Sequence, residues 1–186
     1  MHLFLQGLRR VGKSTVIQKT LDILTADSSF VIGGFYTWNG GPGDPRIYMR
    51  HAGYGKEGEI YQIAEWDAEK GGLISDIGVF EREGVRILNN RAVADLIIMD
   101  ELGFLESRAE GFKRAVLETV AGDVPVFGVL RLGDVPWHTE IKCNPSVELC
   151  DVNESNRDDL PPILADRLRF LVNLSPKQPP PSGNMS

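Results

Sequence analysis

The chain is poor in cysteine and lacks both a long apolar run and a secretory leader, and each absence excludes a class of protein. Its 186 residues include only two cysteines, Cys143 and Cys150, which are too few for a disulfide framework. Their spacing, with His138 nearby, matches no common zinc pattern, so we expect two ordinary thiols in a reducing compartment. No stretch approaches the roughly 20 apolar residues that span a bilayer, and no basic segment leads into the apolar N-terminus. We therefore expect a cytoplasmic protein that does not bind membranes.

Positive charge is also scarce, with 20 lysines and arginines against 26 acidic residues and a formal net charge of −6. An acidic surface repels nucleic acid over most of its area, so nucleic acid is a disfavoured partner, although a local basic groove remains compatible with this balance. The length suits one globular domain, which we place at residues 1–174. Residues 175–186 have a composition typical of disorder. We expect a monomer or a weak oligomer.

Apolar runs and helical periodicities alternate along the chain, which favours an α/β fold. Ser107, followed by Glu110 three positions later, is expected to cap the third helix. Between residues 46 and 80 the segments RIYMRH, EIYQIA and ISDIGVF are β-prone and separated by glycines, which predicts an antiparallel meander. The predicted fold has three layers, with a mostly parallel sheet and the meander at its edge. Strands are predicted at 3–5, 30–37, 95–100, 124–130 and 146–152, and helices at 13–26, 81–94, 107–121 and 156–171.

A phosphate-binding motif lies between the first predicted strand and the first predicted helix. The segment GLRRVGKS fits the P-loop pattern G-x-x-x-x-G-K-[ST] at every fixed position, and the strand and helix around it are the context that this motif requires. Glycines let the loop curl so that its N–H groups face phosphate oxygens, and the helix N-terminus favours anions. We expect Lys13 to bridge the β- and γ-phosphates as a catalytic group and Ser14 to bind Mg²⁺. The predicted nucleotide-binding residues are Gly7, Leu8, Arg9, Arg10, Val11, Gly12, Lys13, Ser14 and Thr15.

Two of these side chains carry an open alternative. Arg9 and Arg10 have the charge to contact phosphate, but loop arginines are commonly solvated, so neither is given a catalytic role. The substrate predicted from the motif is a nucleoside triphosphate such as ATP or GTP, with Mg²⁺ as the cofactor.

An acidic pair ends the apolar run LIIM at residues 96–99. A P-loop requires a second acidic group for magnesium at the end of a hydrophobic strand, and Asp100 fits that description. Glu101 follows at once, where the chain turns, so its carboxylate can orient a water toward the γ-phosphate. Exposed strand ends often carry acids without function, and the P-loop is what favours the functional interpretation. A glutamate in this position is typical of RecA-like ATPases and less so of P-loop kinases.

Four segments together resemble a known family: GLRRVGKST, GGFYT, DLIIMDELGFLE and ESNRDDL, the last at residues 154–160. The sequence is similar to the small nucleoside-triphosphatases of the THEP family, which includes cancer-related nucleoside-triphosphatase. That family often has GPPGVGKTT, where this chain has Leu8, Arg9, Arg10 and Ser14, and serine can serve Mg²⁺ as threonine does. The resemblance implies slow, Mg-dependent hydrolysis of ATP, GTP and other triphosphates, on a fold related to RecA-like and AAA ATPases. It also places Glu106 in the second acidic motif.

Further residues are secondary candidates. Arg131 follows a predicted strand where P-loop enzymes often place a polar γ-phosphate sensor, and we include it among the nucleotide-binding residues. Asn156 and Arg157 could approach the nucleotide or could cap the last helix. Tyr36 and Trp38 could stack on a base or could pack at the core or a sheet edge.

Three functions fit these motifs. The first is a stand-alone nucleoside-triphosphatase in which Glu101 positions the attacking water. The second is a nucleotide or small-molecule kinase, whose acceptor pocket would have to lie in the region from Trp38 to Phe80. The third is a nucleotide-binding switch without turnover, which the presence of Glu101 disfavours.

Overall fold

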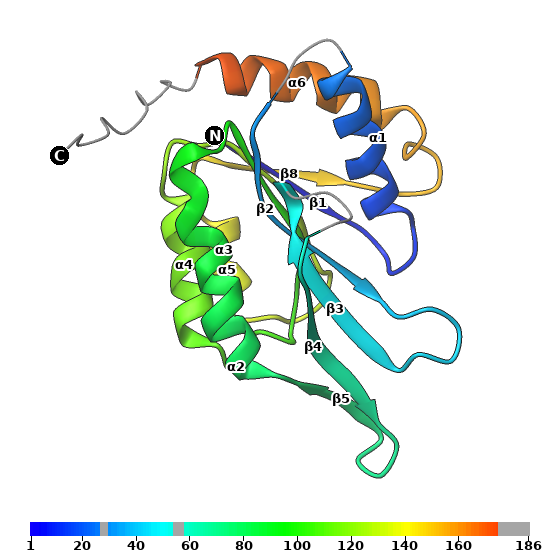
Figure 1. Cartoon of the computed structure of the whole chain (residues 1–186). Coiled ribbons are helices and arrows are strands. Elements are labelled where there is room, and N and C mark those ends of the chain that lie inside the picture. Colours follow the sequence, from blue (N-terminus) through cyan, green and yellow to red (C-terminus); the bar gives the residue numbers. More distant parts are fainter. Residues whose placement is uncertain (27–29, 54–57, 175–186) are drawn as a thin grey trace, which may run out of the picture.

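The computed structural model describes residues 1–26, 30–53 and 58–174, and its centre is one eight-stranded mixed sheet (Figure 1). The strands are β1 (His2–Gln6), β2 (Ile32–Asn39), β3 (Arg46–His51), β4 (Ile60–Asp67), β5 (Gly72–Ser75), β6 (Leu96–Leu102), β7 (Val126–Leu130) and β8 (Val147–Asp151). Their order in the sheet is β5-β4-β3-β2-β6-β7-β1-β8. Strands β2, β6, β7, β1 and β8 are paired in parallel, in that order. Strands β2, β3, β4 and β5 are paired antiparallel.

Helices cover both faces of the parallel part. The helices are α1 (Lys13–Thr25), α2 (Ile77–Val79), α3 (Val85–Asn89), α4 (Glu110–Val120), α5 (His138–Lys142) and α6 (Leu160–Leu174), and a π-helical turn (Phe80–Gly84) joins α2 to α3. Helices α1 and α6 lie on one face, and α3 and α4 lie on the other (Figure 1). Each face has its own buried core: Ile17 and Leu21 of α1 belong to one, and Phe112 of α4 belongs to the other. The three-layer architecture predicted from the sequence is confirmed.

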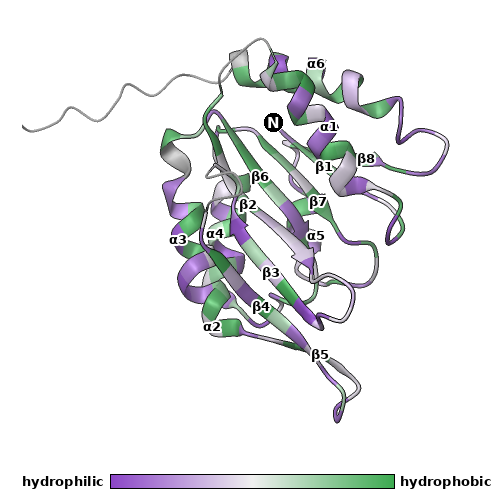
Figure 2. Ribbon diagram, turned by 45° about the vertical axis from the view of Figure 1, so that its right-hand side comes forward, coloured by the Kyte–Doolittle hydropathy of each residue, from purple (hydrophilic) through white to green (hydrophobic). Residues whose placement is uncertain are grey.

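The central strands are apolar because both of their faces are covered. Residues 96–100 at the start of β6 are all buried, as are all five residues of β7, and these strands are strongly hydrophobic in Figure 2. Continuous apolar runs of this kind are typical of parallel strands between two helical layers. Strand β7 lies between β1, which leads into the P-loop, and β6, which carries the acidic pair. This intervening strand gives the sheet the predicted RecA-like order.

The meander differs from the prediction in its third segment. Strands β3 and β4 match two of the three β-prone segments, but the third strand, β5, is shorter and begins earlier, at Gly72. From Ile77 the chain is helical instead, because the Asp76 carboxylate accepts a hydrogen bond from Val79 N (3.0 Å) and caps the first turn. A strong N-cap here overrides the β propensity of the residues that follow.

The predicted start of the third helix, at residue 107, was wrong. Helix α4 begins at Glu110 after Ala109, and no side chain caps it, so the predicted Ser107 cap does not form. Residues 104–107 instead form a turn in which Ser107 N donates to Phe104 O (3.2 Å). The last helix also starts later than expected, at Leu160, because residues 153–159 form hydrogen-bonded turns. The short helix α5 was not predicted.

Several other expectations bear on the same described residues. Both cysteines are free thiols, with Cys143 exposed and Cys150 half-buried. Across residues 1–26, 30–53 and 58–174, no cluster of three or more His, Cys, Asp or Glu side chains suits a metal ion. None of the helices described here is long and apolar enough to cross a membrane. The predicted tail, 175–186, lies outside the described residues.

Candidate active site

The P-loop follows the end of β1, and its backbone curls so that N–H groups point inward. Arg10 (φ 65°) and Gly12 (φ 105°) both have left-handed backbone conformations. Alternation of left- and right-handed residues turns successive N–H groups toward one point and forms an anion-binding concavity. Gly7 is required for a different reason: a Cβ there would lie 2.4 Å from Val152 O, at the end of the neighbouring strand β8. The loop therefore has both the shape of a phosphate cradle and a fixed attachment to the sheet.

Lys13 lies within this loop and is buried. Its Nζ donates to Gly7 O (2.9 Å) and to Leu8 O (3.0 Å), so the ammonium is held across the mouth of the loop. Burial lowers the pKa of Lys13, and the nearby carboxylates of Glu101 and Asp100 oppose that shift. A buried ammonium beside a ring of N–H donors is an arrangement that favours a polyanion.

Ser14 and Asp100 come together from the two sides of the site. Ser14 Oγ donates to Asp100 Oδ1 (3.2 Å), which joins the start of α1 to the end of β6. Burial raises the pKa of the Asp100 carboxyl to about 7, while the Ser14 hydrogen bond opposes that change. A hydroxyl and a carboxylate are hard oxygen ligands of the type that Mg²⁺ prefers, so this pair fits the ion that the motif implies. A bound divalent cation would favour the ionised carboxylate.

Glu101 and Arg131 lie across the cleft from the loop. Glu101 N donates to Thr37 Oγ1 (3.1 Å), which fixes the backbone of the acidic pair against β2. Its carboxylate lies 3.6 Å from Arg131 Nη1, at the longer end of ion-pair distances. The Arg131 guanidinium lies over the Phe104 ring, 4.6 Å from its centroid. Both predicted residues therefore reach the site, and Arg131 is close enough to Glu101 to hold it.

Glu106 holds the turn that follows the acidic pair. Its buried carboxyl accepts a short hydrogen bond from Gly103 N, and Trp137 Nε1 donates to Gly103 O (3.1 Å). One peptide segment is thus fixed from both sides. Because Arg131 N donates to Leu102 O (2.9 Å), fixing this turn also fixes the backbone next to the γ-phosphate sensor candidate.

The Glu106 environment predicts a pH-dependent stability. Burial raises its pKa from 4.5 to about 7. The folded state therefore binds a proton that the unfolded state has released, and this stabilisation is lost as the pH rises through about 7. In urea unfolding at a series of pH values, wild type should lose about 1–3 kcal/mol more than Glu106→Gln between pH values near 4.5 and 7. Asp100 is present in both proteins, so its contribution to the pH dependence cancels in the comparison. If the free energy of unfolding changed equally with pH in the two proteins, Glu106 would not be the group responsible.

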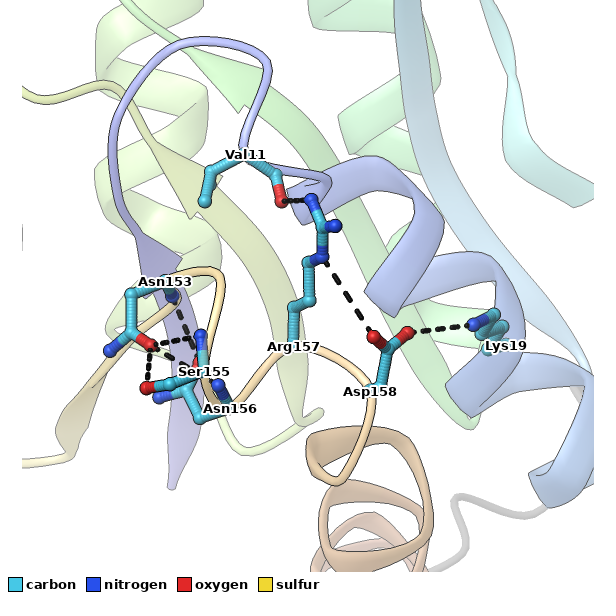
Figure 3. A network of polar contacts seen from close by, with 7 residues as sticks. All are labelled: Val11, Lys19, Asn153, Ser155, Asn156, Arg157 and Asp158. Atoms are coloured by element: carbon cyan, nitrogen blue, oxygen red, sulfur yellow. Dashed lines mark hydrogen bonds and ion pairs between the residues drawn. The ribbon is translucent and has the colours of Figure 1, made fainter.

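A C-terminal segment supports the P-loop from the β8 side (Figure 3). Arg157 Nη1 donates to Val11 O (3.3 Å), and its Nε lies 3.9 Å from Asp158 Oδ2. Asp158 in turn pairs with Lys19 of α1 (3.3 Å). Arg157 thus contacts the backbone of the phosphate loop, a supporting role distinct from the approach to the nucleotide and the helix cap considered above.

Asn156 has a different role from its neighbour. Its Nδ2 donates to Asp151 O and its Oδ1 accepts from Asn153 N, both at 2.9 Å. The side chain thus shapes the turn after β8 rather than capping α6, which begins four residues later. It orients the segment that brings Arg157 to the P-loop (Figure 3).

The P-loop, the acidic pair and Arg131 line one cleft of about 610 Å³ at the carboxyl end of the parallel strands. Of the predicted site residues, all but Val11 line it; Val11 is buried beneath the loop in the α1–α6 core. Trp38 also lines the cleft, while its ring stacks on Tyr48 with centroids 5.7 Å apart. Tyr36 is partly buried against the core on the α1 side, and burial raises its pKa to about 12. Of the two aromatic candidates, Trp38 therefore borders the cleft and Tyr36 does not.

The sequence interpretation missed three supporting residues. Thr37 was quoted only within a family segment, although a hydroxyl at the end of a strand beside β6 was a usable signal. The contacts of Phe104 and Trp137 come from loops, and no periodicity marks them. Glu106 was placed only by resemblance, and the structure adds the reason for it, which is a buried hydrogen bond.

Comparison with known proteins agrees with this geometry. A family model described as NTPase matches residues 2–165. The "Nucleoside-triphosphatase THEP1" of Methanosarcina barkeri is 30% identical over 176 residues, covering 91% of this chain and 98% of the relative. A "Cancer-related nucleoside-triphosphatase homolog" of Bos taurus is 26% identical, covering 90% and 96%.

Two solved structures share the fold. THEP1 from Aquifex aeolicus has a TM-score of 0.72 at 22% identity, covering 90% of this chain and 99% of the other. A human cancer-related nucleoside triphosphatase has a TM-score of 0.73 at 23% identity, covering 91% and 97%. Since the family model spans most of the chain and the relatives match over nearly their whole lengths, the chain belongs to the THEP-type nucleoside-triphosphatase family.

Proposed function

We propose that the protein is a Mg-dependent nucleoside-triphosphatase that hydrolyses ATP and GTP to the diphosphate and inorganic phosphate. The observation that carries the proposal is the meeting of the P-loop with Asp100 and Glu101 in one cleft, joined by the Ser14 hydrogen bond to Asp100. Membership of a nucleoside-triphosphatase family supports the same reaction.

Each residue has a distinct part in the proposed reaction. The P-loop N–H groups and Lys13 bind the phosphates, so Lys13 must leave the loop carbonyls that it now contacts. Ser14 and Asp100 would hold Mg²⁺, which would supply charge neutralisation to the phosphates when bound. Glu101 accepts a hydrogen bond from a water and orients it in line with the γ-phosphorus. Arg131, which pairs with Glu101, stabilises charge that develops on the γ-phosphate.

The proposal is tested by phosphate release from ATP and GTP with no acceptor present. Release should require Mg²⁺, fall at least about 100-fold in excess EDTA and return when Mg²⁺ is restored, because the metal provides several kcal/mol of transition-state stabilisation. Rates that do not change on chelation would contradict the assigned roles of Ser14 and Asp100.

The same assay distinguishes a hydrolase from a nucleotide-binding switch without turnover. Tight nucleotide binding without phosphate release would favour a binding module over a hydrolase. Glu101 disfavours that outcome, because a carboxylate near the γ-phosphate repels the anion and does not strengthen its binding.

A further inference from the structure

The cleft continues well beyond the phosphate-binding part. Past Thr37 and Glu101 it runs over the meander strands to the π-helical turn and to the turn after β6. We call this part the apolar compartment. Its lining residues are Ile47, Ile63, Leu73, Phe80 and Leu105.

The sheet register explains why these side chains face one space. Asn39 of β2 pairs with Ile47 of β3, so the two side chains lie on one face of the sheet, together with Thr37 two residues earlier. Ile63 and Phe80 are almost fully buried and provide a rigid floor. The whole cleft, at about 610 Å³, is within the range of sites that hold small organic molecules. Apolar walls with a few polar groups at one end are typical of such sites.

The charges in the cleft are segregated. Among the residues that the structure describes, the basic side chains that line the cleft are Arg9, Arg10 and Lys13 of the P-loop and Arg131, which follows β7. None of the described lining residues of the meander or of the π-helical turn is basic. Glu101, which lies 3.6 Å from Arg131, and the buried Glu106 are also among the lining residues. A phosphorylated acceptor would therefore find no basic side chain among the described residues of the apolar compartment.

We propose that the apolar compartment binds an uncharged organic alcohol, which accepts the γ-phosphoryl group in place of water. The acceptor oxygen forms a bond to the γ-phosphorus, and the bond to the β,γ-bridging oxygen breaks with its electron pair leaving on the nucleoside diphosphate. The hydroxyl proton passes to Glu101. The inference rests on the proposed positions of the γ-phosphate and Glu101, but not on water being the physiological nucleophile.

Binding is tested on protein labelled at the isoleucine δ1 methyls and loaded with Mg²⁺ and a non-hydrolysable ATP analogue. The probes are thymidine, adenosine and benzyl alcohol, each paired with its phosphate ester. At least one alcohol should shift the Ile47 and Ile63 methyls at a concentration at least tenfold below that needed by its ester, while Ile17 on α1 stays unchanged. Esters that bind as well as the alcohols, or methyls that no alcohol shifts, would overturn the proposal.

Two adjacent residues of β5 provide matched variants. Leu73 lines the compartment, whereas Ile74 points to the opposite face and is exposed. Leu73→Arg should weaken alcohol binding at least tenfold, and Ile74→Arg should not. Thermal unfolding reports whether each variant is folded, and the wild-type titration decides the question if Leu73→Arg is not.

Transfer is followed by phosphorus NMR with ATP and an alcohol that binds. A phosphate ester should accumulate together with ADP. If the alcohol binds and only inorganic phosphate forms, its role as acceptor is wrong. Phosphate release without alcohol is measured separately, so failure of hydrolysis and failure of acceptor binding give different results.

Discussion

Glu101→Gln is expected to lower the rate of phosphate release about 10²- to 10³-fold, the range for loss of a positioned general base. The amide keeps the shape of the side chain but cannot accept a proton. The substitution also removes the ion pair with Arg131, and the Glu101 N–H bond to Thr37 remains because it is a backbone contact. Nucleotide affinity should change little, since Lys13 and the P-loop amides are untouched. Single-turnover hydrolysis and equilibrium binding of a labelled triphosphate measure the two effects.

The control for this experiment is Glu110→Gln. Glu110 lies exposed at the start of α4 and pairs only with Lys113, 2.8 Å away, among the contacts described for it. Its loss should leave turnover unchanged. If Glu101→Gln hydrolysed ATP within a few-fold of the wild-type rate, Glu101 would have no part in the proposed reaction. If the variant instead lost affinity for the triphosphate, Glu101 would act in substrate binding.

Gly34→Ala is expected to destabilise the fold by about 3–5 kcal/mol, which is at the upper end of effects for single substitutions. Gly34 has φ of 86° and lies beside Ile98 in the parallel pairing of β2 with β6. A Cβ there would lie 1.9 Å from Ile98 O and 2.7 Å from Ile98 N. These are backbone atoms in the middle of the sheet and cannot move aside without separating the two strands. Urea unfolding measures the loss.

Gly43→Ala separates the two causes of that effect. Gly43 has nearly the same φ, 84°, but a Cβ there meets nothing within 4 Å. Its substitution should cost only the backbone strain, about 1–2 kcal/mol. Similar losses for the two variants would show that conformation alone, rather than the close approach of β2 to β6, determines the requirement for glycine.

Much of this fold could be predicted from the sequence because its central strands are buried on both faces. The apolar runs before the P-loop and before Asp100 define β1 and β6, and parallel strands bring their carboxyl ends to one edge. The P-loop and the acidic pair were therefore predicted to face each other. Their meeting in one cleft, with Ser14 bonded to Asp100, agrees with that prediction.

The parts that could not be predicted depend on contacts between distant segments. The contribution of Trp137 depends on a loop packing against Gly103, and no local pattern marks it. Helix α5 has five residues, too few to show a period. The predicted Ser107 cap does not form, because this segment instead makes a turn in which the buried Glu106 carboxyl accepts a hydrogen bond from Gly103 N. Likewise, the apolar compartment exists only after the meander is paired.

The position of β1 has a consequence for how the chain acquires its site during synthesis. This strand is made before the others, yet its partners in the described sheet are β7 and β8, as in Leu3 with Phe127 and His2 with Val147. The phosphate loop is further held by Arg157, near the end of the described chain. A nascent chain that ends before β8 therefore leaves the loop without its lateral support, and contacts so distant in sequence form slowly. Nucleotide capture during translation should therefore begin only after nearly the whole domain has left the ribosome.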